Sequence, residues 1–126
     1  MVGRLLVVLT IGVAVTSVLF HNQAQESSRP YRITLIAMGM AFTLRDRPNV
    51  RNPELVLPSN RLVEIEIRNE DTGADHNLTI DALDVKTPVL SPGELAVLRF
   101  VVPESKILAY YCILHPVTMR GQIRAG

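Results

Sequence analysis

Turn-forming residues divide the chain after residue 30 into short segments, and this spacing limits the possible folds more than any other feature. Proline, glycine, asparagine and aspartate recur at short intervals, as in Asn52-Pro53, Asp71-Thr72-Gly73 and Ser91-Pro92-Gly93. Such residues favour turns and interrupt helices, because proline lacks a backbone N–H and glycine and asparagine accept positive φ. No helical apolar period continues across them. We therefore expect no long helix after residue 30.

The segments between the turns have the composition of β-strands. In residues 61–68 the apolar side chains of Val63, Ile65 and Ile67 alternate with charged ones, as expected for a half-buried strand. Six further segments are short, β-branched or aromatic and bounded by turn residues: Tyr31–Met38, Pro53–Leu57, His76–Ile80, Glu94–Val102, Ile107–Cys112 and Gly121–Arg124. Many short strands with regular turns predict an all-β domain, a sandwich of Greek-key type.

The N-terminal part of the chain is of a different kind. An uncharged, mostly apolar run follows Arg4 and ends near residue 20, which is typical of a signal peptide or a short membrane anchor. We expect one hydrophobic helix over residues 1–22, a polar linker over residues 23–30 and the folded domain over residues 31–126. A retained helix would anchor the domain to a membrane on the extracytoplasmic, periplasmic side, and cleavage would release a secreted or periplasmic protein.

Composition excludes several classes of function. Thirteen basic and twelve acidic side chains leave a net charge of +1, which gives no basic footprint for nucleic acid. One cysteine cannot form an internal disulfide or a site that needs two thiolates, such as a zinc cluster or an iron–sulfur cage. No nucleophile is paired with a base, and no glycine-rich phosphate loop is present, so we expect neither an enzyme nor a small-molecule substrate.

Residues 110–126 carry the most informative chemistry. Cys112 ends a predicted strand, and His115 and Met119 follow it within one short stretch. Thiolate, imidazole and thioether are ligands that copper prefers, and a tight loop can turn all three toward one point. A fourth ligand must come from elsewhere, and His76 follows a turn-rich segment that can place it at the same end of a sandwich. Two histidines, a cysteine and a weak axial methionine are the ligands of blue-copper electron-transfer sites.

From about Ile33 to Gly126 the sequence resembles the cupredoxins, the family of plastocyanin, amicyanin, pseudoazurin and azurin. The resemblance rests on the segment that leads to His76-Asn77, on the aromatic Tyr111 before the cysteine, and on the Cys-x-x-His…Met-x-Gly ending. It implies a cupredoxin-like β-sandwich with one mononuclear copper site. The implied ligands are His76, Cys112, His115 and Met119, and Asn77 would tie the two ligand loops together.

The resemblance also implies a function. A type 1 (blue) copper protein would carry single electrons at the membrane surface, to or from a membrane redox complex or a soluble redox protein. That partner would dock on apolar residues around His115, namely Ile113, Leu114, Pro116 and Val117. Two alternatives remain open: a copper-free, cupredoxin-like subunit that stabilises a membrane electron-transfer or photosynthetic complex, and a protein that binds and delivers copper.

The sequence departs from the family pattern in two places. The turn before His76 is acidic, with Glu70, Asp71 and Asp75, and Arg120 places a cation beside Met119. Met38 and Met40 are possible substitutes for the axial ligand, although we expect them to pack in the core. The arginine-rich segment 45–52 is interpreted as a solvated surface loop, with docking of an anionic partner as the alternative.

Overall fold

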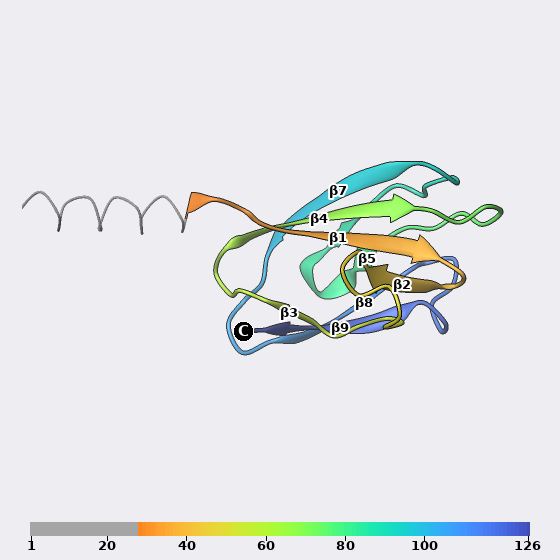
Figure 1. Ribbon diagram of the computed structural model, residues 1–126. Helices are drawn as coiled ribbons and strands as arrows, with labels where there is room; N and C mark the ends of the chain where they lie inside the picture. Colours follow the sequence, from red (N-terminus) through yellow and green to blue (C-terminus); the bar gives the residue numbers. More distant parts are fainter. Residues whose placement is uncertain (1–27) are drawn as a thin grey trace, which may run out of the picture.

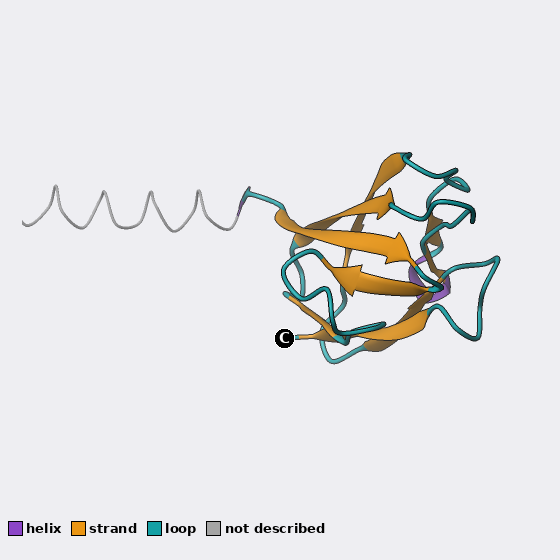
Figure 2. Ribbon diagram, turned by 45° about the vertical axis from the view of Figure 1, so that its right-hand side comes forward, coloured by secondary structure: helices purple, strands orange, loops and turns teal. Residues whose placement is uncertain are grey.

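Two β-sheets make up the protein in a computed structural model that describes residues 28–126 (Figures 1 and 2). One sheet has the strand order β2-β1-β4-β7, and the other has the order β3-β9-β8-β5-β6. A 3₁₀ turn, η1, spans Asp81–Leu83. The strands are β1 (Tyr31–Met38), β2 (Ala41–Leu44), β3 (Leu55–Leu57), β4 (Leu62–Asn69), β5 (Thr79–Ile80), β6 (Val85–Lys86), β7 (Leu95–Val101), β8 (Ile107–Tyr111) and β9 (Arg120–Ala125).

The predicted helix over residues 1–22 and most of the predicted linker lie outside the described residues. Within residues 28–126, no helix has the length and apolar character needed to cross a membrane. Strand β1 begins at Tyr31, the residue at which we expected the folded domain to begin.

The core lies between the two sheets and follows from the alternation seen in the sequence. Along β4, Val63, Ile65 and Ile67 are buried, while the charged residues between them are only partly covered. Apolar side chains of both sheets join this cluster, including Leu35 of β1, Leu108 of β8 and Ile123 of β9. Burial of each large apolar side chain stabilises the fold by roughly 1.5–3 kcal/mol. The predicted half-buried strand is confirmed.

Many of the strands pair with strands that are distant in the sequence. Strand β1 pairs with β4 in parallel, and β3 pairs with β9 in parallel, whereas the remaining ladders are antiparallel. This arrangement, with neighbours in space drawn from distant parts of the sequence, agrees with the expected sandwich of Greek-key type. All seven predicted strands have counterparts, although only Thr79 and Ile80 of the expected His76–Ile80 strand are in a ladder.

Strands β2 and β6 were not predicted. Gly39 and Met40 join β1 to β2 as a two-residue turn, and both have φ of 60°. Positive φ at both positions is the type I′ hairpin geometry, for which Asn-Gly is the usual sequence signal and Gly-Met is not. The expectation that Met38 and Met40 pack in the core is wrong. Met38 and Met40 are 55% and 36% exposed, because Met40 lies in this surface turn and Met38 directly precedes it.

Tyr110 and Gly121 lie in β8 and β9, one pair away from the loop that carries three of the predicted ligands. The two residues are paired across β8 and β9, and a Cβ atom on Gly121 would collide with the Tyr110 ring. The buried Tyr110 hydroxyl donates a hydrogen bond to the Pro53 carbonyl oxygen at 2.6 Å. Glycine is therefore needed at position 121 so that the Tyr110 ring can lie against the backbone of β9.

Candidate metal centre

The predicted ligands lie at one end of the sandwich. Strand β4 leads into the segment that carries His76, and β8 leads into the loop from Cys112 to Met119; both leave the sheets at the right-hand end of Figure 1. The start of β1 and the C-terminus lie at the opposite end (Figure 1). The fold thus brings two distant segments to one edge and places them away from the point where the chain enters the domain.

Backbone hydrogen bonds close the loop between Cys112 and Met119. The Cys112 N–H donates to the Met119 carbonyl at 3.0 Å, and the His115 N–H donates to the Cys112 carbonyl at 3.1 Å. The Met119 N–H donates in turn to the His115 carbonyl at 3.0 Å. These bonds join the backbones of the three predicted ligands directly. The relative positions of the three backbone segments therefore depend little on side-chain contacts.

His76 approaches this loop from the other segment. Its side chain is fully buried, and its Nδ1 atom lies 4.0 Å from the Sγ atom of Cys112, which is also fully buried. The His76 and His115 rings have centroids 5.2 Å apart and an interplanar angle of 59°. Met119 is fully buried and belongs to the core cluster that contains Cys112.

These separations can be compared with those that one metal ion would require. Bonds of about 2.0 Å to nitrogen and about 2.3 Å to sulfur, as at zinc, place the two donor atoms about 3.7 Å apart at a trigonal angle. The observed 4.0 Å between His76 and Cys112 is close to this value. Two imidazoles bound to one ion through similar bonds at the same angle have centroids about 5.5 Å apart, near the observed 5.2 Å. The donor types and these two separations fit a mononuclear copper ion.

The convergence is nevertheless incomplete. Among residues 28–126, no group of three or more histidine, cysteine, aspartate or glutamate side chains is arranged to hold a metal ion. The structure brings His76 close to Cys112 and to the His115 ring. Assignment of all four residues as ligands remains a prediction.

Asn77 connects the two segments. Its backbone N–H points to the Cys112 sulfur at 3.4 Å, and its side-chain Oδ1 accepts a hydrogen bond from the Ile113 N–H at 2.8 Å. Its Nδ2 donates to the Thr79 hydroxyl at 3.0 Å. Among the described residues, every buried side-chain nitrogen or oxygen has a hydrogen-bond partner. These hydrogen bonds join the two segments, and the role of Asn77 at a copper site stays a prediction.

Three residues near the site were not singled out as site residues by the sequence. Asn69 is buried, and its Nδ2 donates to the carbonyls of Ala74 and Leu90, which shapes the segment before His76. Asn52 donates through Nδ2 to the Thr118 carbonyl at 2.8 Å and so contacts the loop next to Met119. Both asparagines occur at predicted turns, but a turn signal does not show which distant backbone a side chain will reach.

Asp71 is the third such residue. Its Oδ2 lies 3.0 Å from Nε2 of His76, and it also accepts the Gly39 N–H at 3.2 Å. The hydrogen bond from His76 is the main cause that lowers the pKa of Asp71, with further contributions from the backbone N–H groups of Thr72 and Gly73. Partial burial acts in the opposite direction. The acidity of this turn was visible in the sequence, whereas the contact with His76 was not.

Arg120 does not direct its charge at the candidate ligands. Its guanidinium lies 5.2 Å from the centre of the Tyr111 ring, which is a cation–π arrangement. The Tyr111 hydroxyl donates to Asp81 at 2.7 Å, and this hydrogen bond raises the pKa of Tyr111. The departure from the family pattern at position 120 is thereby accommodated on the outside of β8.

The apolar residues next to His115 in the loop are exposed, and His115 itself is half-buried. Ile113, Leu114 and Val117 are exposed, and Val117 is 89% exposed. The neighbouring Pro116 is exposed as well. Solitary exposed apolar residues are ordinary, but several around one candidate ligand form a patch that can dock a partner.

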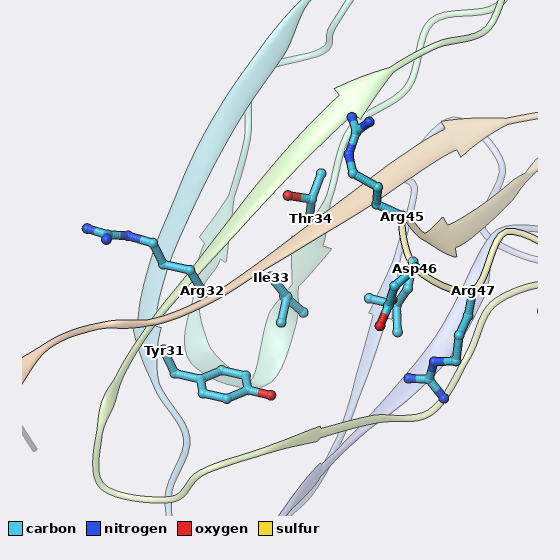
Figure 3. A pocket seen from close by; sticks show the side chains of 8 residues that line it. Tyr31, Arg32, Ile33, Thr34, Arg45, Asp46 and Arg47 are labelled. Carbon is cyan, nitrogen blue, oxygen red and sulfur yellow. The ribbon is translucent and has the colours of Figure 1, made fainter. Parts of the chain in front are cut away.

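A second surface feature is a groove near the start of β1, lined by residues that include Tyr31, Arg32, Arg45 and Arg47. The three guanidinium groups point away from one another (Figure 3). Arg32 pairs with Glu64 at 2.7 Å, and Arg45 pairs with Glu70 at 3.4 Å. The groove therefore does not focus positive charge on one point, in agreement with the interpretation of segment 45–52 as a solvated loop.

Comparison with known proteins identifies the fold. No protein-family model matches the sequence, and no curated protein matches it. Among solved structures, dithionite-reduced auracyanin from Roseiflexus castenholzii matches with a TM-score of 0.62 and 16% identity, over 76% of this chain and 97% of that chain. Auracyanin A from Chloroflexus aurantiacus, a "blue" copper protein, matches with a TM-score of 0.62 and 17% identity, over 78% and 100%.

A copper-containing nitrite reductase from Thermus scotoductus also matches, with a TM-score of 0.57 and 22% identity. The match covers 77% of this chain and 28% of the enzyme, so the chain corresponds to only a part of it. Together these similarities show that the described chain has the cupredoxin fold, as the sequence predicted. The auracyanins are matched over nearly their whole length.

Proposed function

We propose that this chain is a type 1 copper protein that carries single electrons. The observation that carries the proposal is the approach of the buried Cys112 sulfur and His76 Nδ1 to 4.0 Å, beside the His115 ring. His76, Cys112 and His115 would hold the metal, and Met119 would be the weak axial ligand. Copper bound there would supply one-electron chemistry between Cu(I) and Cu(II).

The surrounding residues support electron transfer over catalysis. Full burial of His76, Cys112 and Met119 excludes water from their side of the site. The backbone hydrogen bonds of the loop and the side chain of Asn77 keep the donor atoms in place, which favours a small rearrangement when the charge of the metal changes. The Cys112 sulfur is fully buried and so is not accessible to a substrate, and we infer that the chain is an electron carrier and not an enzyme.

His115 is the candidate ligand nearest the surface, and electrons would enter and leave through it. A redox partner would dock weakly on the patch of Ile113, Leu114, Pro116 and Val117. The partner would be a membrane redox complex or a soluble redox protein. The apolar run before residue 22 would keep the domain near such a complex on the periplasmic side and raise its effective concentration.

The test is optical and electrochemical. Copper-loaded chain should bind one copper ion and have an intense visible absorption band that disappears on reduction and returns on oxidation. Cys112→Ser should abolish the band, because the thiolate is its source. Met38→Leu is the matched control, since this methionine is exposed, and it should leave the band unchanged.

Other results would support a different function. Colour that persists in Cys112→Ser would contradict the ligand assignment. Absence of copper binding would favour a copper-free subunit that stabilises a membrane electron-transfer complex. Tight binding of Cu(I) without reversible oxidation would favour copper delivery.

A further inference from the structure

The two ring nitrogens of His76 face different partners. Nδ1 lies 4.0 Å from the Cys112 sulfur, and Nε2 lies 3.0 Å from Oδ2 of Asp71. The imidazole is fully buried, so water does not compete for either nitrogen. Asp71 is therefore the partner that determines how this ring is oriented and which nitrogen carries the proton.

Asp71 is itself held in place by backbone groups. The Thr72 N–H donates to its Oδ1 at 2.8 Å, and the Gly39 N–H in the β1–β2 turn donates to its Oδ2 at 3.2 Å. Its own backbone N–H donates to the side chain of Asn69 at 3.0 Å. Because donors from two separate turns fix the carboxylate, it can in turn fix the imidazole.

The direction of the hydrogen bond follows from the charge state. An aspartate at neutral pH is ionised and can only accept hydrogen bonds, so Nε2 of a neutral His76 must carry the proton. A neutral imidazole has one N–H, and the lone pair then lies on Nδ1, the nitrogen that faces Cys112. The contact with Asp71 thus prepares the nitrogen that a metal would need.

We propose that Asp71 is a positioning residue that fixes the Nε2-protonated form of His76, makes Nδ1 a stronger metal ligand, and favours the oxidised over the reduced state of the bound ion. This inference rests on the proposed function. A carboxylate that accepts the second N–H of a ligating histidine makes the imidazole more basic. Its negative charge stabilises Cu(II) more than Cu(I), because the interaction grows with the charge of the ion.

The experiment compares Asp71→Asn with Asp75→Asn. Both remove one negative charge from the same turn, but Asp75 is exposed and Asp71 contacts the ligand. Loss of such a partner weakens metal binding about 10- to 100-fold, and we expect a loss of this size in Cu(II) affinity for Asp71→Asn alone. The reduction potential should rise in the same variant, by about 59 mV for each tenfold loss of Cu(II) affinity relative to Cu(I).

A second measurement does not need copper. Nitrogen NMR of the metal-free wild-type chain should show His76 protonated at Nε2, and Asp71→Asn should shift the population toward protonation at Nδ1. A wild-type ring protonated at Nδ1 would overturn the proposal, even if the variant failed to fold. Equal affinities and potentials in the two variants would also overturn it.

The two measurements separate this inference from the function on which it rests. If the wild-type chain binds no copper but His76 is protonated at Nε2, the orienting role of Asp71 is supported and the copper function fails. If copper binds with the expected spectrum but the reduction potential is unchanged in Asp71→Asn, the proposed function is supported and the proposed role of Asp71 is contradicted.

Discussion

Replacing Asn77 with alanine should destabilise the metal-free domain, because this side chain joins the two segments that carry the candidate ligands. The variant leaves the Ile113 N–H without its acceptor and removes the donor to the Thr79 hydroxyl. A buried group left without a partner costs about 1–3 kcal/mol, and the lower end of this range applies to the Ile113 N–H because it is only partly buried. An ordinary hydrogen bond contributes about 1 kcal/mol, so the two losses together amount to about 2 kcal/mol, which for a domain of this size lowers Tm by on the order of 10 °C.

Thermal unfolding of the metal-free chain, followed by circular dichroism, measures this effect without any contribution from copper. Asn49→Ala is the matched control, because Asn49 is exposed in a surface turn and its replacement should change stability by less than about 0.5 kcal/mol. If the two variants unfold at the same temperature, Asn77 does not hold the segments together and the structural argument for the site is refuted.

Two further predictions concern the strand pair that bounds the ligand loop. Gly121→Ala should destabilise the fold by about 1–3 kcal/mol in urea unfolding, because the new methyl group collides with Tyr110, whereas Gly73→Ala, at an open position, should have little effect. Burial raises the pKa of the Tyr110 hydroxyl above its ordinary value near 10, so the unfolded state loses the hydroxyl proton at a lower pH than the folded state. The contribution of Tyr110 to the free energy of unfolding is therefore complete below about pH 10 and should fall as the pH rises further. Tyr110→Phe should reduce that alkaline loss; an unchanged pH dependence would contradict the assignment.

The sequence predicted those parts of the fold that depend on local pattern. Alternation along residues 61–68 gave the buried face of β4 correctly, since a strand has a period of two whatever its partners. Residues Ile107–Cys112 were also predicted as a strand, and β8 spans Ile107–Tyr111, one residue shorter. In contrast, β2 has four residues and follows a Gly-Met turn that carries little hairpin signal.

Prediction of the site was limited by long-range contacts. The ligand types and the spacing from Cys112 to Met119 could be read directly, because they lie in one short loop. The contact between Asp71 and His76 depends on how the turn folds back, which is set by Asn69 and by the distant Gly39 N–H. Sequence spacing gives no information about such a three-way contact, so the acidic turn could be noted but not interpreted.

The central claim is that His76, Cys112 and His115 bind one copper ion at the end of the sandwich. A crystal structure of the copper-loaded chain, with anomalous diffraction measured at the copper edge, tests this claim most directly. The account predicts a single anomalous peak within bonding distance of the Cys112 sulfur and of one nitrogen of each imidazole, with Nδ1 as the ligating atom of His76. A peak elsewhere on the surface, or a bound copper ion that makes no bond to the Cys112 sulfur, would contradict it.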